Sequence, residues 1–398
     1  MRSLLICSLF CSFVFAENLE ILQNEKKELR ILEKKSIESR YESLKNDWIS
    51  SITINSGLSR DHSFSSKSGS FDKSASIGFT QSIYESGGIE LSIKYAKDKY
   101  DSEMLAWESD NYTILQTVYE TLLEISKIKL QIEQSSYSLQ NKEIELILKK
   151  IQYEAGSGDI TDLNNAMIAK NSQYKENISL QNSLKDKEYE LSKYTSLKYD
   201  EIEILDFKGI KKEDFINQNI ALLVEKSKIE MLNTSYKQTK VSYLPKVSTT
   251  LKANYLDSED FYSSTQKEAS NTGLASLNLT VPLYDYNKSN KVEESKVDYL
   301  KQKAQVNDLK NQLAYEYEQI LNQIDSYEKY NETIKNSIKI YDDLLSINKI
   351  SNDAGMTSTY DLDILKNTKK INEYDIAINE INIKLQYSKL YFKTKGEH

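Results

Sequence analysis

Polar and apolar residues alternate with a period of two in four short stretches of this chain. The stretches are 48–60, 73–84, 245–256 and 273–284. In the second stretch, for example, Ala75, Ile77 and Phe79 alternate with Ser76 and Gly78. Such alternation predicts β-strands with one polar and one apolar face. A strand of about ten residues has the length that a tilted strand needs to cross a bilayer. The polar stretches around 61–72 and 257–272 are predicted to be loops, so the strands form two hairpins.

Long amphipathic helices are predicted for most of the remaining chain. In residues 289–354 apolar side chains recur at steps of three and four positions, as in a coiled coil, and residues 89–155 repeat this pattern. Neither stretch contains proline, and the whole chain has only 2 prolines and 11 glycines. The other predicted helices are 18–47, 160–197, 213–241 and 357–393.

The lengths of these helices indicate how they are arranged. Each of the two long stretches would form a rod about 100 Å long. The segments 160–197 and 357–393 would each span about 55 Å, and the segments 18–47 and 213–241 about 45 Å. The length of one long helix therefore equals the summed length of two shorter helices placed end to end, as a closed cylinder of helices requires. The segment 198–212 would cross the outside of the cylinder at its waist.

The whole pattern occurs twice, and the second copy follows the first by about 200 residues. The segment Phe79–Glu85 (FTQSIYE) matches Leu279–Asp285 (LTVPLYD), and Tyr153–Gly156 (YEAG) matches Asn352–Gly355 (NDAG). The chain is therefore predicted to consist of two structural repeats. They cover residues 17–212 and 213–398, and each is a helix-strand-strand-helix-turn-helix unit.

Four transmembrane strands cannot close into a barrel, because every backbone polar group in lipid must be paired. Several chains must therefore contribute strands to one barrel. A dimer would supply eight strands and a trimer twelve, with a wider lumen. The predicted inward faces are mostly Ser, Thr, Asn and Gly, which suit a water-filled interior. The predicted fold class is mainly α with a small transmembrane β part.

The first residues carry an export signal. Arg2 precedes the apolar run Leu4–Phe15, and Ala16 offers a cleavage site, so residues 1–16 are predicted to be a signal peptide. The alternative is a buried N-terminal helix. Both cysteines, Cys7 and Cys11, lie in this segment, and Phe10 is a poor lipobox residue for lipidation of Cys11. The remaining chain then has no thiol for a disulfide or a metal site.

The composition excludes several classes of function. The formal net charge of −8 argues against nucleic acid as a partner. We find no Gly-rich phosphate loop and no nucleophile elbow, and His62 and His398 are the only histidines. The sequence therefore predicts neither an enzyme nor a cofactor or metal site.

Two sets of residues stand at the junctions between the predicted elements. Aromatic residues lie at all four strand–helix junctions, where they would form an interfacial belt or simply pack at a corner. These residues are Trp48, Tyr84, Tyr243, Tyr284 and Tyr286. Gly156 and Gly355 each follow a long helix and are predicted to be left-handed C-cap residues.

This arrangement resembles the TolC-like outer membrane factors over residues 17–393. The most specific marks are the strand-to-helix corner Val281–Asp285, the Gly turn at Tyr153–Gly156 followed by Asp162-Leu163, and the Leu244-Pro245 entry to the third strand. The resemblance implies a homotrimer in the outer membrane, with a twelve-stranded β-barrel continuing into a twelve-helix coiled-coil α-barrel in the periplasm. It implies a passive exit duct of a tripartite efflux pump or a type I secretion system. The implied partners are outer-membrane lipid, a periplasmic adaptor protein and an inner-membrane transporter.

The resemblance also implies roles for individual residues. The turns at Gly156 and Gly355 would be the periplasmic tips where the adaptor docks. Asp361, with Asp363, would ring the closed periplasmic aperture, and Asp162 is the counterpart after the first turn. Acidic residues in a first helical turn also serve as caps or complement the helix dipole, so that reading stays open for all three.

The chain departs from the family pattern near this aperture. Ile364 stands where the family has a second aspartate, Asn352 where it has an aromatic residue, and Thr357 where it has a basic residue. These departures put in question the salt-bridged lock that holds some family members shut. The alternative function is a periplasmic coiled-coil adaptor or a structural rod, but an adaptor usually carries one helical hairpin, and this chain carries two.

Overall fold

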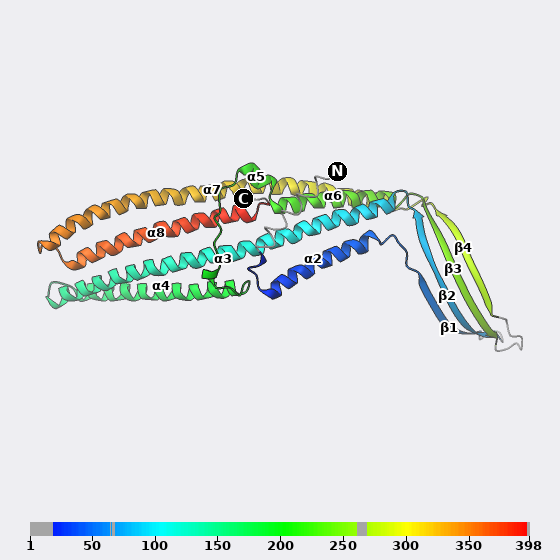
Figure 1. Cartoon of the computed structure of the whole chain (residues 1–398), viewed down its shortest axis with the longest axis horizontal. Helices are drawn as coiled ribbons and strands as arrows, with labels where there is room; N and C mark the ends of the chain where they lie inside the picture. The colour runs from blue at the N-terminus through cyan, green and yellow to red at the C-terminus, as the bar shows by residue number, and fades with distance from the viewer. Residues whose placement is uncertain (1–18, 64, 66–67, 261–268, 396–398) are drawn as a thin grey trace. The chain divides into compact units, whose positions relative to one another are not determined.

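The computed structural model describes residues 19–63, 65, 68–260 and 269–395, and the expected signal peptide lies outside them. Figure 1 follows the elements along the chain. They are α2 (Asn24–Lys45), β1 (Thr53–Ser63), β2 (Ser68–Tyr84), α3 (Gly88–Glu154), α4 (Ile160–Ser192), η1 (Tyr199–Glu201), α5 (Lys212–Asn217), α6 (Ile220–Val241), β3 (Lys246–Asp260), β4 (Ser270–Thr280), α7 (Lys288–Asp353) and α8 (Thr359–Phe392). No helix in the described part of the chain is both long enough and apolar enough to span a membrane.

The chain forms two compact units that do not coincide with the two sequence repeats. Among the described residues, one unit comprises those up to Leu32, Trp107–Leu223 and those from Leu309 onward, and the other comprises Glu33–Ala106 and the described part of Val224–Asp308. Each unit contains parts of both repeats, because the long helices α3 and α7 each contribute to both units. Helices pack along their sides, so neighbours in space come from both copies.

The second unit contains one antiparallel sheet with the strand order β1-β2-β3-β4. Ile77 of β2 lies opposite Ile54 of β1 and Ala253 of β3, and Leu277 of β4 lies opposite Thr249 of β3. Residues opposite each other in a ladder share a face. The period-two alternation of all four strands therefore gives one predominantly apolar face and one polar face, as the sequence predicts.

The strands extend further into polar sequence than predicted. The ladder between β1 and β2 continues to Ser63 and Ser68, so most of the expected loop is paired. On the other side of β2, Lys73 Nζ contacts Glu259 Oε1 at 2.7 Å and Asp257 Oδ2 at 3.4 Å on β3. Cross-strand ion pairs and hydrogen bonds thus hold a strand extension whose composition is typical of a loop.

The opposite ends of β1 and β4 are shorter than predicted. Pro282 has no backbone N–H for a ladder, and β4 ends at Thr280, opposite Lys246 at the start of β3. β1 begins at Thr53 rather than at residue 48. Before it, the Gln81 side chain accepts a hydrogen bond from Ser50 N at 3.0 Å and donates one to the Trp48 carbonyl oxygen at 2.9 Å. A side-chain amide therefore replaces the ladder there.

The predicted helix 213–241 is divided into α5 and α6. Asn219 stands between them, and its Oδ1 accepts a hydrogen bond from Leu222 N at 3.2 Å, which caps the start of α6. The same residue forms an antiparallel bridge with Thr394 near the end of the described chain. A strong N-cap residue thus starts a new helix within the predicted stretch.

The first unit has its core where α3 meets the segment after α4. Apolar side chains from one face of α3 are fully buried, among them Leu115, Val118 and Leu122. The Tyr119 ring stacks on the Phe392 ring with centroids 5.5 Å apart, and the Phe207 ring packs edge-on to Tyr119 at 6.1 Å. The segment expected to cross the waist is therefore anchored by an aromatic cluster.

Candidate functional site

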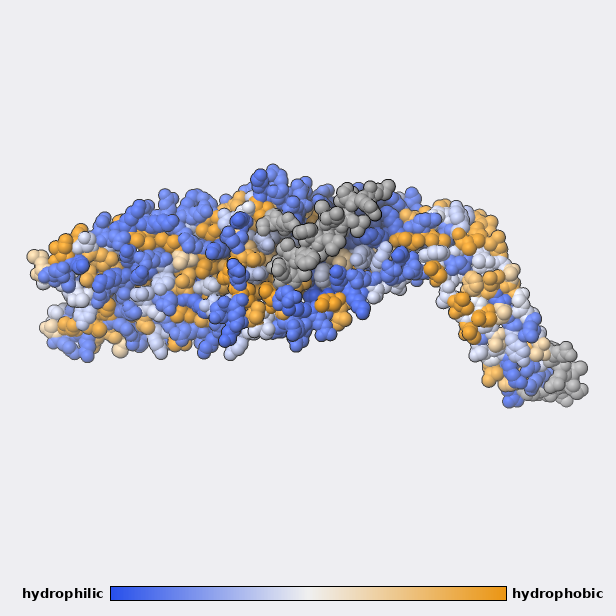
Figure 2. All heavy atoms as spheres, in the orientation of Figure 1, coloured by the Kyte–Doolittle hydropathy of each residue, from blue (hydrophilic) through white to orange (hydrophobic). Residues whose placement is uncertain are grey.

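Three features of the described residues carry the candidate function: the two faces of the sheet, the aromatic residues beside it, and the two turns between long helices. The exposed apolar residues of the sheet belong mainly to one face. Ile54 is 76% exposed and Leu277 is 71% exposed, although both lie on this face within regular strands. Figure 2 shows hydrophobic residues along the strands of the second unit. A solvent-exposed apolar strand face of this kind requires lipid or another apolar partner.

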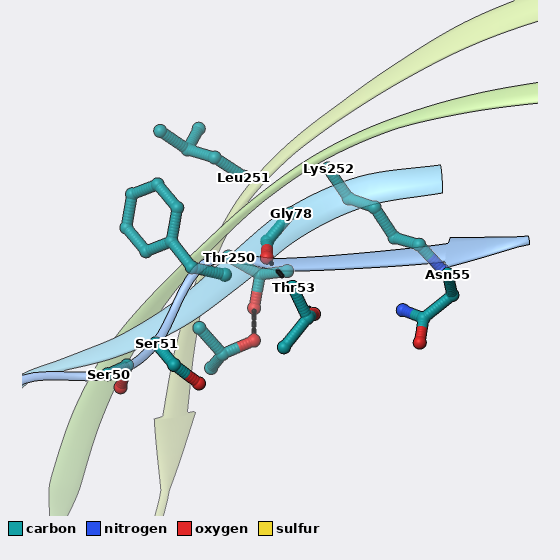
Figure 3. Close-up of a pocket in the computed structure, with 10 residues that line it drawn as sticks. Ser50, Ser51, Thr53, Asn55, Gly78, Thr250, Leu251 and Lys252 are labelled. Atoms are coloured by element: carbon teal, nitrogen blue, oxygen red, sulfur yellow. Dashed lines mark hydrogen bonds between the residues drawn. The ribbon is translucent and has the colours of Figure 1, made fainter. Parts of the chain in front are cut away.

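The polar face carries small hydroxyl and amide side chains. Thr80 and Thr250 contact each other through their hydroxyl oxygens at 3.0 Å, and the Thr53 hydroxyl donates to the Gly78 carbonyl oxygen at 3.4 Å. These groups line an open hollow on the polar face (Figure 3). The expected water-facing surface is thus present on the side opposite the apolar face.

The predicted interfacial aromatics differ in their surroundings. Tyr284 is 83% exposed and Tyr286 is 79% exposed, and Tyr84 and Trp48 are exposed as well. Tyr243 is half-buried, and Lys288 Nζ lies 5.5 Å from the centre of its ring. The interfacial belt therefore remains a prediction for all five aromatics, of which Tyr243 is the least exposed.

The two Gly turns adopt the same backbone motif. Gly156 has a φ of +71°, its N–H donates to the Tyr153 carbonyl, and Ser157 N–H donates to the Gln152 carbonyl. This pair of bonds is the Schellman motif, which satisfies carbonyl groups at a helix C-terminus. Gly355 after α7 has the same pattern, so the predicted C-cap role is confirmed for both glycines.

In the second turn Gly355 has a φ of +75°. Gly355 N–H donates to the Asn352 carbonyl at 2.9 Å, and Met356 N–H donates to the Ser351 carbonyl at 2.8 Å. A left-handed backbone at this position is strained for any residue with a Cβ. Glycine is therefore required by the backbone of each turn.

Side chains tie the second turn together. Asn352 Nδ2 donates to the Thr357 carbonyl at 2.9 Å, and Thr357 Oγ1 donates to Asn348 Oδ1 at 3.0 Å. We call these three residues the amide clasp. Asn352 and Thr357 are two of the departures from the family pattern, and here they bond within one turn of one chain. The third member, Asn348, could not be predicted from the sequence, because asparagine inside a helix has no distinctive pattern.

The predicted gate aspartates have local partners within the chain. Asp361 Oδ2 accepts hydrogen bonds from the Ser358 hydroxyl at 2.8 Å and from Ser358 N at 3.3 Å, while Asp361 N donates to the Ser358 hydroxyl oxygen. This is a capping box. Asp363 lies 3.1 Å from Lys366 Nζ, and Asp162 lies 3.0 Å from Lys149 Nζ. Asp361 therefore caps α8, and both other aspartates form exposed ion pairs.

The hairpins that carry the two turns are packed against each other within the first unit (Figure 1). Gln134 Nε2 on α3 donates to Asp375 Oδ1 on α8 at 2.6 Å. On the second hairpin, Lys369 Nζ donates to Asp342 Oδ1 at 2.6 Å, and this hydrogen bond raises the pKa of Lys369. The Gln134 hydrogen bond therefore joins the two hairpins, whereas the Lys369 hydrogen bond joins α7 to α8 within the second hairpin.

The described residues contain no cluster of three or more His, Cys, Asp or Glu side chains that could hold a metal ion. The candidate site consists of the strand faces, the aromatic residues and the two turns described above.

The chain matches the family model described as outer membrane efflux protein over residues 31–196 and 213–368. It belongs to the outer membrane efflux protein family. The resemblance drawn from the sequence is confirmed, and so are the location in the outer membrane and the large helical periplasmic part. The family consists of efflux proteins, which favours the duct over the adaptor or rod.

Solved structures show the same fold. The outer membrane protein VceC of Vibrio cholerae has a TM-score of 0.71 and 12% identity, with 96% of this chain and 95% of that chain covered. The CmeC outer membrane channel of Campylobacter jejuni has a TM-score of 0.71 and 13% identity, with 98% and 87% covered. CusC has a TM-score of 0.71 and 12% identity, with 97% and 92% covered. No curated protein matches this sequence.

These comparisons confirm the predicted fold class of a mainly helical chain with a small antiparallel strand part. At these identities the likeness concerns the fold alone. The roles of the aspartates, the glycine turns and the aromatics in this chain remain predictions.

Proposed function

We propose that three copies of this chain form a passive outer-membrane duct that works with a periplasmic adaptor and an inner-membrane transporter, in a tripartite efflux pump or a type I secretion system. The observation that carries the proposal is the open sheet. Within the described residues β1 and β4 each pair with one neighbour only, so the sheet has two unpaired edges. In lipid, unpaired backbone groups each cost several kcal/mol.

Closure with neighbouring copies satisfies these edges. β1 and β4 run antiparallel to each other, because the order is sequential and each pairing is antiparallel. β4 of one copy can therefore continue the ladder onto β1 of the next. Three chains supply a twelve-stranded barrel with the apolar face toward lipid and the polar face toward the lumen. The same threefold axis would bring the copies of Asp361 together at the periplasmic aperture, while the turns at Gly156 and Gly355 offer the adaptor its docking ends.

Disulfide cross-linking tests this assembly. Cys7 and Cys11 are the only cysteines, so both are replaced by serine. Asn55→Cys on the polar face of β1 is then combined in turn with cysteine at each polar-face position of β4, such as Asn278→Cys. Within one chain β1 and β4 are separated by two strands, or about 14 Å, which is beyond disulfide reach. Any cross-link must join two copies.

For at least one pair of positions, we expect denaturing electrophoresis without reductant to show covalent dimers and trimers beside the monomer. Leu277→Cys is the matched control, because Leu277 neighbours Asn278 but lies on the apolar face. Cross-linked species no larger than the dimer, or no cross-link at any polar-face position of β4, would contradict a trimeric barrel. Membrane fractionation separates the duct from the adaptor or rod, since only the duct requires detergent for extraction.

A further inference from the structure

An open hollow of about 470 Å³ lies on the polar face of the sheet, where β1, β2 and β3 run side by side (Figure 3). Its polar lining comes from hydroxyl, amide and ammonium groups, and among the described residues no carboxylate lines it. The polar side chains are those of Ser50, Ser51, Thr53, Asn55, Thr80, Thr250 and Lys252. Such a set offers hydrogen-bond donors and one positive charge, which is the chemistry that recognises an anion.

Of the described residues that line this hollow, Lys252 alone is charged. It is exposed and points toward Asn55 in Figure 3, and no described residue forms a hydrogen bond or ion pair with it. The other lysine on the polar face of β3 is different, because Lys246 Nζ lies 3.7 Å from Glu85 Oε2. The charge of Lys252 is therefore available to a ligand.

Acidic residues of the same face lie too far along the strands to neutralise Lys252 in salt. Asp72, on the polar face, accepts hydrogen bonds from Ser258 at 2.5 Å and from Ser70 at 3.2 Å. Lys252 lies opposite Gly78, six positions along β2 from Asp72, which corresponds to about 20 Å along the strand. The Debye length at physiological ionic strength is about 8 Å. The two charges therefore act separately.

Gly78 contributes by having no side chain. A Cβ there would lie 2.7 Å from the Leu251 carbonyl oxygen and 3.0 Å from the Lys252 Cα. Glycine lets β2 and β3 approach at this point and presents no side chain directly opposite Lys252.

We propose that this hollow binds small polyanions carrying phosphate or carboxylate groups, with Lys252 as the charge and the surrounding hydroxyl and amide groups as hydrogen-bond donors. The proposal deepens the proposed duct, because the polar face is there the wall of the lumen. Three copies of Lys252 would form a ring that favours anionic cargo along this part of the path. Rings of lysine in pores select for anions in this way.

Inorganic tripolyphosphate is the probe. It is titrated into the detergent-solubilised full chain by calorimetry, and it is added to the barrel side of channels in planar bilayers at low salt. Loss of one unit charge about 4 Å from an anion corresponds to about a fivefold weaker interaction in water. Lys252→Gln is therefore expected to raise both the dissociation constant and the half-blocking concentration at least about fivefold.

A charge-shift variant separates charge from folding. Asn254 lies two positions from Lys252 on the same face, so Lys252→Gln combined with Asn254→Lys should restore binding and block. Asn254→Gln in the same background changes the same position without adding a charge and should restore neither. Equal affinity and block in wild type and Lys252→Gln, or no response of wild type to tripolyphosphate, would overturn the anion site.

The two proposals fail differently. Channels that conduct but do not respond to tripolyphosphate leave the duct intact and refute the site. Lys252-dependent binding in calorimetry without any conductance would support the site and refute the duct.

Discussion

Arginine scanning of β2 tests the assignment of the two sheet faces. Ile77 lies on the apolar face between Ile54 and Ala253, whereas its neighbour Ser76 lies on the polar face between Asn55 and Asn254. An arginine at the bilayer midplane on a lipid-facing strand position costs about 2–4 kcal/mol. Three copies of Ile77→Arg in one trimer would therefore cost about 6–12 kcal/mol, which is comparable to the whole stability of a typical domain, about 5–15 kcal/mol.

The position of Ile77 within the apolar band supports the midplane cost of about 2–4 kcal/mol for arginine at this residue. The band on β3 runs from Val247 to Tyr255, about 27 Å along the strand, or about 20 Å along the membrane normal at a tilt near 40°. Ile77 lies opposite Ala253, within two residues of the centre of this band. Leu279 lies opposite Val247, at the edge of the band, where an arginine costs only about 0–1 kcal/mol. Arginine should therefore be tolerated far better at residue 279 than at residue 77.

The assay measures the fraction of each variant that reaches the outer membrane as a trimer resistant to dodecyl sulfate, together with the urea midpoint after refolding into lipid vesicles. Ile77→Arg should abolish or strongly reduce both, and Leu277→Arg should lie between Ile77→Arg and Leu279→Arg. Ser76→Arg and Asn278→Arg should assemble, because they face water. Equal losses at residues 76 and 77 would refute the assignment of the faces, and a reversed order would exchange lipid and lumen.

Three further predictions concern the helical part. Gly355→Ala should destabilise its turn by about 1–2 kcal/mol because φ is +75°. Faster hydrogen exchange in the turn would show this. Gly273→Ala, which has open space around it, is the control and should have no effect. The double variant Asp361→Asn, Asp363→Asn should form trimers but show lower cation selectivity in planar bilayers. It should also lose any block by multivalent cations added from the periplasmic side. An unchanged channel would show that these residues serve only to stabilise α8. Phe215→Ala, in a fully buried position, should cost about 3–5 kcal/mol, seen as a lower thermal midpoint, and a change below 1 kcal/mol would show that this site can collapse.

The sequence predicted the faces of the strands more reliably than their ends. Period-two alternation determines which side chains share a face, so the face of Ile77 and Leu277 followed from the sequence alone. Strand ends depend on individual bonds that composition does not reveal. The Gln81 amide takes the place of a ladder before β1, and the Lys73 pairs hold strand where the sequence looks like a loop.

The candidate site could be predicted only in part, for a related reason. Glycine in a helix-ending position has one dominant use, so the turns at Gly156 and Gly355 followed from the sequence. Lysine in a strand has many uses. Lys252 became distinctive only when the register placed it on the polar face opposite Gly78, in a hollow without carboxylates.

The two turns show how duplicated backbone has acquired different side-chain ties. Both have the same Schellman bonds, so the backbone motif is common to the two repeats. After the first turn, Asp162 pairs with Lys149 across an exposed gap of 3.0 Å, an interaction that salt weakens. The second turn is tied by the uncharged amide clasp, with bonds of 2.9 and 3.0 Å, which salt does not screen. The residues that depart from the family pattern therefore give the second turn an internal uncharged tie, and in the first turn the Ser157 hydroxyl, which donates to the Gln152 carbonyl at 3.1 Å, supplies one as well.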